Sequence, residues 1–319
     1  MTPHLKGNAV KKRFLLALLL VGFAAAQNET RDVIDDAGSE IEIPVDPQRV
    51  AVAGERVLTE MAVAFGVAPT AAAATDEFAP FLLEAIGGAD IQPLGSASEI
   101  NLEALAAADP DLILLDVREE GDAVLEAARQ IAPTVQLESF GVTPYTLIDT
   151  FGELFGAETG AALRARLGER IEEVRASVGT PEATEVSVGQ LEPGGFRLIL
   201  DTMLGATLIN DIGFARPEGQ GEAARSEADD LGLIRNLSLE ELPRVEGDVL
   251  FFQTYNNQED LESVTTSPLW ESLDVVQRDA VQLVNYQAWN LGGVLAAEVV
   301  LDDIMAGLEQ AGLVETSSE

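Results

Sequence analysis

The sequence predicts an α/β protein built of two lobes that a long helix joins. Three observations lead to this prediction. Short apolar strands alternate with amphipathic helices, residues 158–178 form one continuous helical pattern, and a helix–strand unit of the first half recurs in the second half. We therefore expect two Rossmann-like lobes, at residues 27–157 and 179–319, connected by the helix at 158–178, with a cleft between them.

The first 26 residues have the features of a secretory signal. Four basic residues within positions 6–13 precede an apolar run at 14–23, and three alanines end at Ala26. The run is about half of the ~20 residues that span a bilayer, so we expect cleavage and not a membrane anchor. Because the chain has no cysteine to acylate, we expect a protein that is soluble outside the cytoplasmic membrane and not a lipoprotein.

Composition excludes several functions. The chain of 319 residues carries 55 acidic and 19 basic residues, a formal charge of −36. Loss of residues 1–26 would remove four basic residues and His4, leaving a charge of −40. This charge disfavours nucleic acids and anionic lipids, and we interpret it as adaptation to a salty medium. Without cysteine or a second histidine, Ser–His–Asp triads, thiolate zinc sites and histidine-ligated metals are excluded from the mature chain.

Strand and helix signals alternate along the first lobe. Period-two alternation and a Gly38 turn predict a hairpin at residues 31–44. Asn101 is a side-chain cap for a helix that Asp109-Pro110 ends. The remaining expected elements are strands at 50–53, 111–115 and 134–137 and helices at 58–65, 101–108 and 123–131. Such βαβ alternation with short connections predicts a mostly parallel sheet covered by helices.

The segment 158–178 predicts a helical strut between the lobes. Apolar residues form one stripe and charged residues cover the other faces, until Gly179-Thr180-Pro181 stops the helix. At 1.5 Å per residue, about twenty helical residues span ~30 Å, the width of a small domain.

An internal near-repeat supports two lobes of similar topology. Residues 101–105 and 111–115 match residues 238–242 and 248–252 at a constant offset of 137, with a capping residue, a first-turn glutamate and a strand-opening aspartate in each copy. A weaker match aligns residues 49–69 with 197–217 at an offset of 148.

Ligand-binding residues are expected in the loops at the carboxyl ends of the strands. These loops follow Ala53, Leu115, Leu137, Leu200, Phe252 and Val284. All three tyrosines of the chain and one of its two tryptophans lie there. These side chains suit the wall of a ligand site because each has an apolar ring face and a polar O–H or N–H group. The candidate ligand contacts are Arg56, Arg118, Tyr145, Tyr255, Tyr286 and Trp289.

The order of several segments resembles periplasmic binding proteins of ABC importers for ferric siderophores. These segments are the hairpin with 44–50, the motif of 101–114, Arg216-Pro217-Glu218-Gly219-Gln220, Ser267-Pro268-Leu269-Trp270, and Trp289-Asn290-Leu291-Gly292-Gly293 with the helix around 301–303. The resemblance covers essentially the whole mature chain. It implies a monomer that captures a ferric siderophore and delivers it to a permease dimer, with no covalently bound cofactor and no metal ligands of its own.

The resemblance also implies roles for particular residues. Glu103 and Glu240, one in each lobe, would pair with arginines of the permease. The cleft-loop residues would hold the anionic chelate, and Arg225 in the segment 219–230 is a further candidate. Trp270 is expected in the core because it follows Pro268-Leu269 in a packing motif.

Three alternatives stay open at this point. The same cleft suits haem or a corrinoid, two tyrosines with carboxylates suit bare Fe³⁺, and paired carboxylates suit a secreted α/β hydrolase. Enzyme readings find little support because the sequence contains no G-x-x-x-x-G-K-[ST] or G-x-S-x-G motif. We expect a binding protein and not an enzyme.

Overall fold

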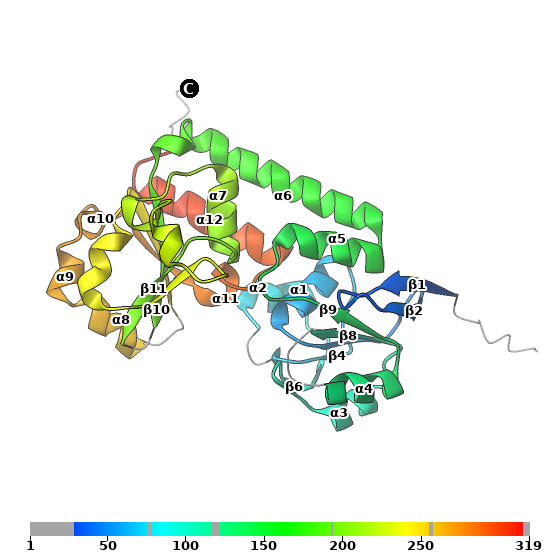
Figure 1. The fold of residues 1–319 in the computed structure, drawn as a ribbon. Helices are drawn as coiled ribbons and strands as arrows, with labels where there is room; N and C mark the ends of the chain where they lie inside the picture. Colours follow the sequence, from blue (N-terminus) through cyan, green and yellow to red (C-terminus); the bar gives the residue numbers. More distant parts are fainter. Residues whose placement is uncertain (1–28, 76–77, 117–121, 193, 255–257, 315–319) are drawn as a thin grey trace, which may run out of the picture.

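The two-lobed α/β architecture is confirmed by a computed structural model, which describes residues 29–75, 78–116, 122–192, 194–254 and 258–314. The lobes lie side by side, and the long helix α6 (Ala157–Val178) runs across both (Figure 1). The expected signal peptide lies outside the described residues. Within them, each lobe contains a five-stranded sheet.

The sheet of the first lobe is parallel, as expected. Its strand order is β5-β4-β3-β8-β9. Alternate residues of the central strand face opposite helical layers: Val50 and Val52 pack with α1 and α5, whereas Ala51 and Ala53 pack with α3 and α4. The strands are β3 (Val50–Ala53), β4 (Ala71–Ala72), β5 (Gln92–Pro93), β8 (Leu112–Asp116) and β9 (Thr134–Leu137), and the helices are α1 (Arg56–Ala64), α2 (Pro80–Ile86), α3 (Leu102–Ala107), α4 (Asp122–Ile131) and α5 (Pro144–Phe155).

Two small sheets complete this lobe. The expected hairpin forms from β1 (Thr30–Ile34) and β2 (Glu40–Pro44). A second short hairpin pairs β6 (Gly95–Ser96) with β7 (Glu99–Ile100).

The sheet of the second lobe is mixed, unlike the parallel sheet of the first lobe. β10 (Val186–Glu192), β13 (Val249–Thr254) and β14 (Val281–Asn285) are parallel. On the other side of β10, β11 (Gly195–Ile199) pairs antiparallel with both β10 and the edge strand β12 (Leu233–Leu237). Glu192 pairs with Gly195, so only two residues of the sequence separate the paired ends of β10 and β11. The Pro-Gly sequence at 193–194 is the turn signal that predicts this hairpin.

Helices and helical turns surround this sheet. They are α7 (Leu204–Ile212), α8 (Gln258–Thr265), α9 (Pro268–Glu271), α10 (Asp274–Gln277), α11 (Tyr286–Trp289) and α12 (Val294–Gln310), with the 3₁₀ segments η2 (Pro181–Ala183), η3 (Glu218–Gln220), η4 (Ala224–Glu227) and η5 (Leu239–Val245). No helix in the described ranges is long and apolar enough to cross a membrane.

Two aspartates confirm the stronger sequence repeat. The carboxylate of Asp111 accepts the N–H groups of Gln48 and Arg49, both at 2.9 Å, at the start of β3. The carboxylate of Asp248 accepts the N–H of Glu185 at 2.8 Å, at the start of β10. Each aspartate directly precedes its own strand and binds the backbone just before the neighbouring parallel strand.

The weaker repeat holds for the helices and fails for the strands. Its offset of 148 aligns α1 (Arg56–Ala64) with α7 (Leu204–Ile212) from end to end. Val50 pairs with Leu112 in the first lobe and Val186 with Val249 in the second, so β10 is the structural equivalent of β3. The weaker alignment instead matched β3 to Arg197 and its neighbours, which form the antiparallel strand β11. Similar apolar composition in the two strands explains the mistaken match.

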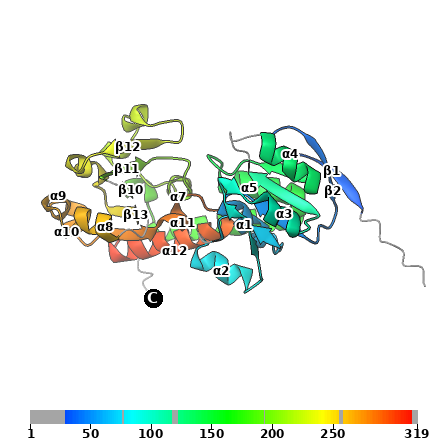
Figure 2. The same cartoon turned by 90° about the horizontal axis from the view of Figure 1, so that it is seen from below.

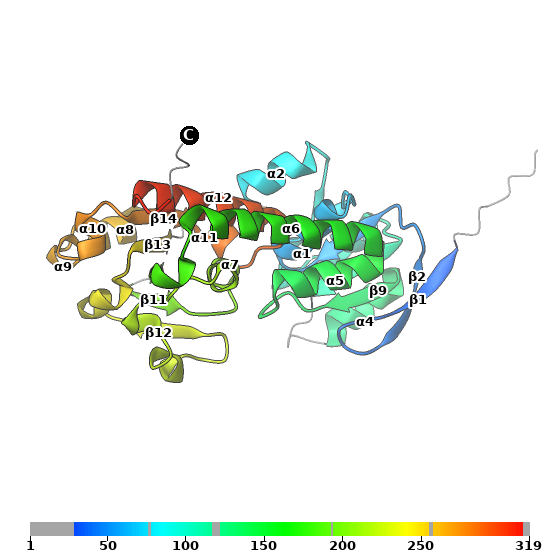
Figure 3. The ribbon, with the colours of Figure 1, turned by 90° about the horizontal axis from the view of Figure 1, so that it is seen from above.

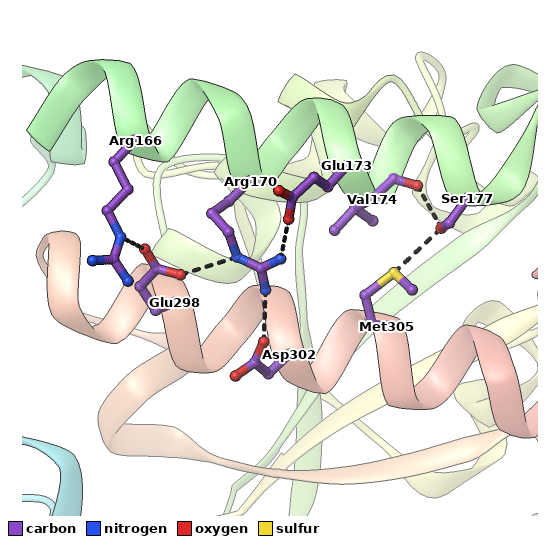
Figure 4. Close-up of polar contacts among 8 residues, drawn as sticks. All are labelled: Arg166, Arg170, Glu173, Val174, Ser177, Glu298, Asp302 and Met305. Atoms are coloured by element: carbon purple, nitrogen blue, oxygen red, sulfur yellow. Dashed lines mark hydrogen bonds and ion pairs between the residues drawn. The ribbon is translucent and has the colours of Figure 1, made fainter. Parts of the chain in front are cut away.

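Helices α6 and α12 form a layer that joins the lobes (Figure 3). Arg170 of α6 donates from Nε to Glu298 at 3.1 Å and from Nη2 to Asp302 at 2.7 Å, and Arg166 donates to the other oxygen of Glu298 at 2.7 Å (Figure 4). One hydrophobic cluster also continues from α1 and β3 through these helices to β10 and β13. The expected strut is confirmed, and a continuous core favours small movements between the lobes.

Candidate ligand-binding site between the lobes

The carboxyl ends of the first lobe's strands are closely packed. Ser139, after β9, donates its hydroxyl hydrogen to the carboxylate of Asp116 at the end of β8, with both oxygens at 2.8 Å. A Cβ at Gly54, after β3, would lie 2.7 Å from the Cβ of Asp116. Only glycine permits this approach, so three strand ends form one compact polar edge.

A small pocket of about 10 Å³, room for about one water molecule, lies where the lobes meet. It is smaller than the ~300–1,000 Å³ that is usual for small-molecule sites, so it is at most part of a larger one. The first lobe contributes Val57, Ser139, Val142, Pro144 and Leu147, and the second contributes Thr202, Leu204, Asn290, Leu291 and Gly292.

The structure brings two candidate contacts, Arg56 and Tyr286, together at the lobe boundary. Arg56 begins α1 and is only 4% exposed. Its Nη2 donates to the carbonyl oxygen of Gln287 at 2.9 Å, and its Cζ lies 5.9 Å from the centre of the Tyr286 ring. Arg56 therefore connects the two lobes, and Tyr286 packs beside it.

Tyr145 also connects the lobes. Its hydroxyl donates to Oδ2 of Asp211 at 2.7 Å, which joins α5 to α7, and Arg164 lies over its ring at 5.2 Å. Burial, and then the hydrogen bond to Asp211, raise the pKa of Tyr145 above its ordinary value. The hydroxyl thus stays protonated as a donor over the ordinary pH range.

Trp289 lies in the core, which corrects its assignment to a ligand wall. The side chain is 0% exposed, its ring stacks on Phe251 at 4.7 Å between centres, and Nε1 donates to Asp303 at 2.8 Å. No face of the ring is left for a ligand. Trp270 is buried beside Phe252, as expected.

The other candidates have different outcomes. Arg225 in η4 is ion-paired with Asp201, and both side chains are partly exposed. Arg118 and Tyr255 lie outside the described residues.

A buried polar row in the second lobe was missed by the sequence analysis. Gln190 pairs in register with both Arg197 and Gln253, so the three side chains leave the same face of the sheet near the carboxyl ends of β10 and β13. Arg197 is 7% exposed and donates to Oε1 of Gln190 from Nη2 at 2.6 Å and from Nε at 3.1 Å. Its Nη1 lies 3.3 Å from Glu192. We call Gln190, Arg197 and Gln253 the polar row.

The polar row has unused hydrogen-bonding capacity. In the part of the chain that the structure describes, Nε2 of Gln190 and both Nε2 and Oε1 of Gln253 are buried without a hydrogen-bond partner. Unsatisfied buried amides are rare because each costs ~1–3 kcal/mol. The sequence signal was available: glutamine interrupts an apolar strand at both positions.

Phe140 is a second residue that was missed. It follows Ser139 in the loop after β9, and its side chain is 48% exposed. An exposed aromatic ring at this edge is available to an apolar part of a ligand.

The two candidate docking glutamates are exposed, one on each lobe. Glu103 follows the expected cap, since Asn101 accepts the N–H of Ala104 at 3.0 Å. Glu240 lies in η5, which is a 3₁₀ segment containing Pro243 and not the α-helix that the repeat suggested. A hydrogen bond with Ser238 lowers the pKa of Glu240, so this carboxylate keeps its charge.

Comparison with known proteins decides the family. The model of the family described as "Periplasmic binding protein" matches residues 52–285. The chain belongs to this family. Its members are binding proteins, which agrees with the expectation of a binding role. Within the described ranges, no group of three or more His, Cys, Asp or Glu residues is arranged to hold a metal ion.

Several relatives of this periplasmic binding protein have been named. It is 28% identical over 291 residues to the probable siderophore-binding lipoprotein YfiY of Bacillus subtilis, covering 88% of each chain. It is 25% identical to the Fe(3+) dicitrate-binding periplasmic protein FecB of Escherichia coli, covering 91% of this chain and 94% of that one. The structure of Staphylococcus aureus SirA complexed with staphyloferrin B has the same fold, with a TM-score of 0.72 and 22% identity over 90% of this chain and 99% of the other.

Proposed function

We propose that this periplasmic binding protein captures a ferric siderophore between its lobes and delivers it to the permease of an ABC importer. The names of YfiY and FecB support an iron chelate as the ligand. They favour this function over haem, a corrinoid or hydrolysis. The chain has no cysteine and no histidine after His4, so it lacks the usual nitrogen and sulfur ligands for a metal ion. This supports binding of iron that is already chelated.

The polar row is the observation that carries this proposal. Against a formal charge of −36, an anionic chelate needs a local cation and hydrogen-bond donors. Arg197 supplies a fixed guanidinium, and Gln190 and Gln253 add buried amide groups with unused hydrogen-bonding capacity behind it. We propose that Arg197, which is 7% exposed, contacts an oxygen atom of the chelate, and that Gln190 and Gln253, which are 0% exposed, position it without touching the ligand. Phe140 would lie against the apolar part of the chelate, with Tyr286, Arg225, Arg118 and Tyr255 as further contacts.

Fluorescence titration with hydroxamate, catecholate and carboxylate ferric siderophores tests the proposal. We expect saturable binding of at least one chelate, and a loss of about tenfold or more in affinity for Arg197→Gln, because a charge-assisted hydrogen bond contributes ~1.5–3 kcal/mol. Arg235→Gln is the matched control, since Arg235 lies in the same sheet but is ion-paired with Asp229 at the surface. Equal losses in both variants would exclude a specific role for Arg197.

Docking through Glu103 and Glu240 belongs to the same proposal. Two exposed carboxylates, one per lobe, suit a permease with paired basic sites. Reversing both charges with Glu→Lys should abolish uptake and leave chelate affinity unchanged. Reversing Glu84 and Glu271, which are also exposed on the two lobes, is the control. Unchanged uptake by the first variant would refute this docking site.

We further propose that residues 1–26 are removed on secretion and that the mature protein is a monomer without a lipid anchor. The chain has no cysteine to carry a lipid, although the relative YfiY is named a lipoprotein. Intact mass measurement should give a chain that begins at Gln27, and sedimentation should give a monomer. A membrane-bound product of full length would contradict cleavage.

A further inference from the structure

A buried carboxylate joins the lobes at the start of α12. Glu60 of α1 is 2% exposed, and its two oxygens accept the N–H of Gly293 at 3.0 Å and the N–H of Ala296 at 2.8 Å. These groups belong to the first turn of α12, where backbone N–H groups have no partner within the helix. The cap therefore comes from the first lobe, 233 residues earlier in the chain than Gly293.

The contact depends on a close approach of α1 to the start of α12, which extends from α1 into the second lobe (Figure 2). A Cβ at Gly293 would lie 2.5 Å from Sδ of Met61 and 3.0 Å from Oε1 of Glu60. Glycine at this position has no side chain that could cap the helix, and α12 has no side-chain cap of its own. Glu60 therefore supplies the side-chain cap that residues next to α12 do not provide.

Arg56 adds a second contact from the same face of α1. It lies one helical turn before Glu60 and donates to the carbonyl oxygen of Gln287. The segment 287–296 is thus held near both ends by the first lobe. This segment connects β14 to α12 and contributes Asn290, Leu291 and Gly292 to the pocket between the lobes.

Burying the Glu60 carboxylate is unfavourable, and nearby groups stabilise its charge. Burial raises the pKa of Glu60, while the N–H groups of Gly293 and Ala296 and the charge of Arg56 act in the opposite direction. The positive end of α12 also favours a carboxylate at this place. Separating the lobes here would leave the first turn of α12 uncapped.

We propose that Glu60 is a positioning residue of the ligand site, whose cap on α12 fixes the segment 287–296 relative to the first lobe. The effect on ligand affinity rests on the proposed function. The effect on the lobes does not, because it concerns the ligand-free protein. Glu60 acts through the backbone and does not itself contact the chelate.

Glu60→Gln and a matched control separate positioning from ordinary capping. Glutamine has nearly the same shape but offers one acceptor oxygen and places an NH₂ group toward the helix N–H groups. Glu246→Gln is the control, because Glu246 accepts the N–H groups of Asp274 at 2.8 Å and Val275 at 3.1 Å within the second lobe alone. Both variants lose a bidentate cap, but only one of these caps crosses between the lobes.

The distance between the lobes is the quantity to measure, because the loss of an ordinary helix cap at Glu60 would leave it unchanged. The chain has no cysteine, so Ser98→Cys and Ser272→Cys place one spin label on the surface of each lobe. For Glu60→Gln we expect a broader distance distribution and about tenfold weaker binding of the tightest ferric siderophore in the panel, which is within the usual range of coupling between sites. For Glu246→Gln we expect lower stability to urea, with distances and affinity unchanged.

Unchanged distances in folded Glu60→Gln would overturn the proposal, because Glu60 would then be an ordinary helix cap. If no chelate binds the wild-type protein, the proposed function fails and the distances still decide the role of Glu60. Should Glu60→Gln not fold, Gly293→Ala replaces it, since its Cβ would push α12 away from Met61. The same broadening is expected for Gly293→Ala, and unchanged distances there would also refute the proposal.

Discussion

Gly205→Ala tests the position of Trp289, on which the corrected ligand site depends. Gly205 is the second residue of α7, and a Cβ there would lie 2.1 Å from Cε3 and 2.8 Å from Cζ3 of Trp289. The ring has no room to move, since it is 0% exposed and stacked on Phe251. Overpacking of this kind costs ~1–3 kcal/mol, against a gain of at most ~1 kcal/mol in helix propensity. We expect a net loss of about 1–2 kcal/mol in the free energy of unfolding.

Urea unfolding followed by circular dichroism measures this loss. Gly168→Ala is the matched control, because Gly168 lies within α6 and a Cβ there would meet no atom within 4 Å. This control should gain ~0.5–1 kcal/mol. If Gly205→Ala were as stable as Gly168→Ala, Trp289 would not pack against α7, and a ligand-facing Trp289 would return to consideration.

Two further predictions concern salt and pH. Arg170→Met should lower the free energy of unfolding by about 1 kcal/mol in dilute buffer, and this difference should shrink in molar salt because screening weakens ion pairs. An equal difference at both salt concentrations would contradict it. The raised pKa of Tyr145 means that the folded state favours the neutral phenol, so its stabilising contribution is present below the ordinary pKa of 10.0 and is lost as pH rises above it. Urea unfolding at about pH 9 and about pH 11 should therefore show a smaller alkaline loss for Tyr145→Phe than for the wild type, and equal losses would refute the hydrogen bond to Asp211.

Local signals explain which elements could be predicted. Strands β3 and β9 have the bounds expected from the sequence because short apolar runs lie between clear turn residues. The capped helix α3 and the strut α6 also form as expected. The paired aspartates Asp111 and Asp248 were recognisable because each occupies the same place in a repeated strand unit.

Long-range packing explains most of what could not be predicted. Trp289 follows a strand end, which suggested a cleft, but Gly205 of α7 and Phe251 of β13, both distant in the sequence, pack against its ring. Arg56 and Tyr145 were expected to face a ligand, whereas each forms a polar contact with the other lobe that no local pattern reveals. The polar row depends on the register between β10, β11 and β13, so sequence spacing alone does not assemble it.

Equilibrium dialysis of the mature protein against radiolabelled iron tests the central claim most directly, because it asks whether iron is captured only as a chelate. The account predicts retention of about one iron per chain with at least one ferric siderophore, consistent with a single site between two lobes. It also predicts no retention when iron is supplied as the weak chelate ferric nitrilotriacetate. Retention of iron from nitrilotriacetate to the same level, or no retention with any siderophore by the folded protein, would contradict the account.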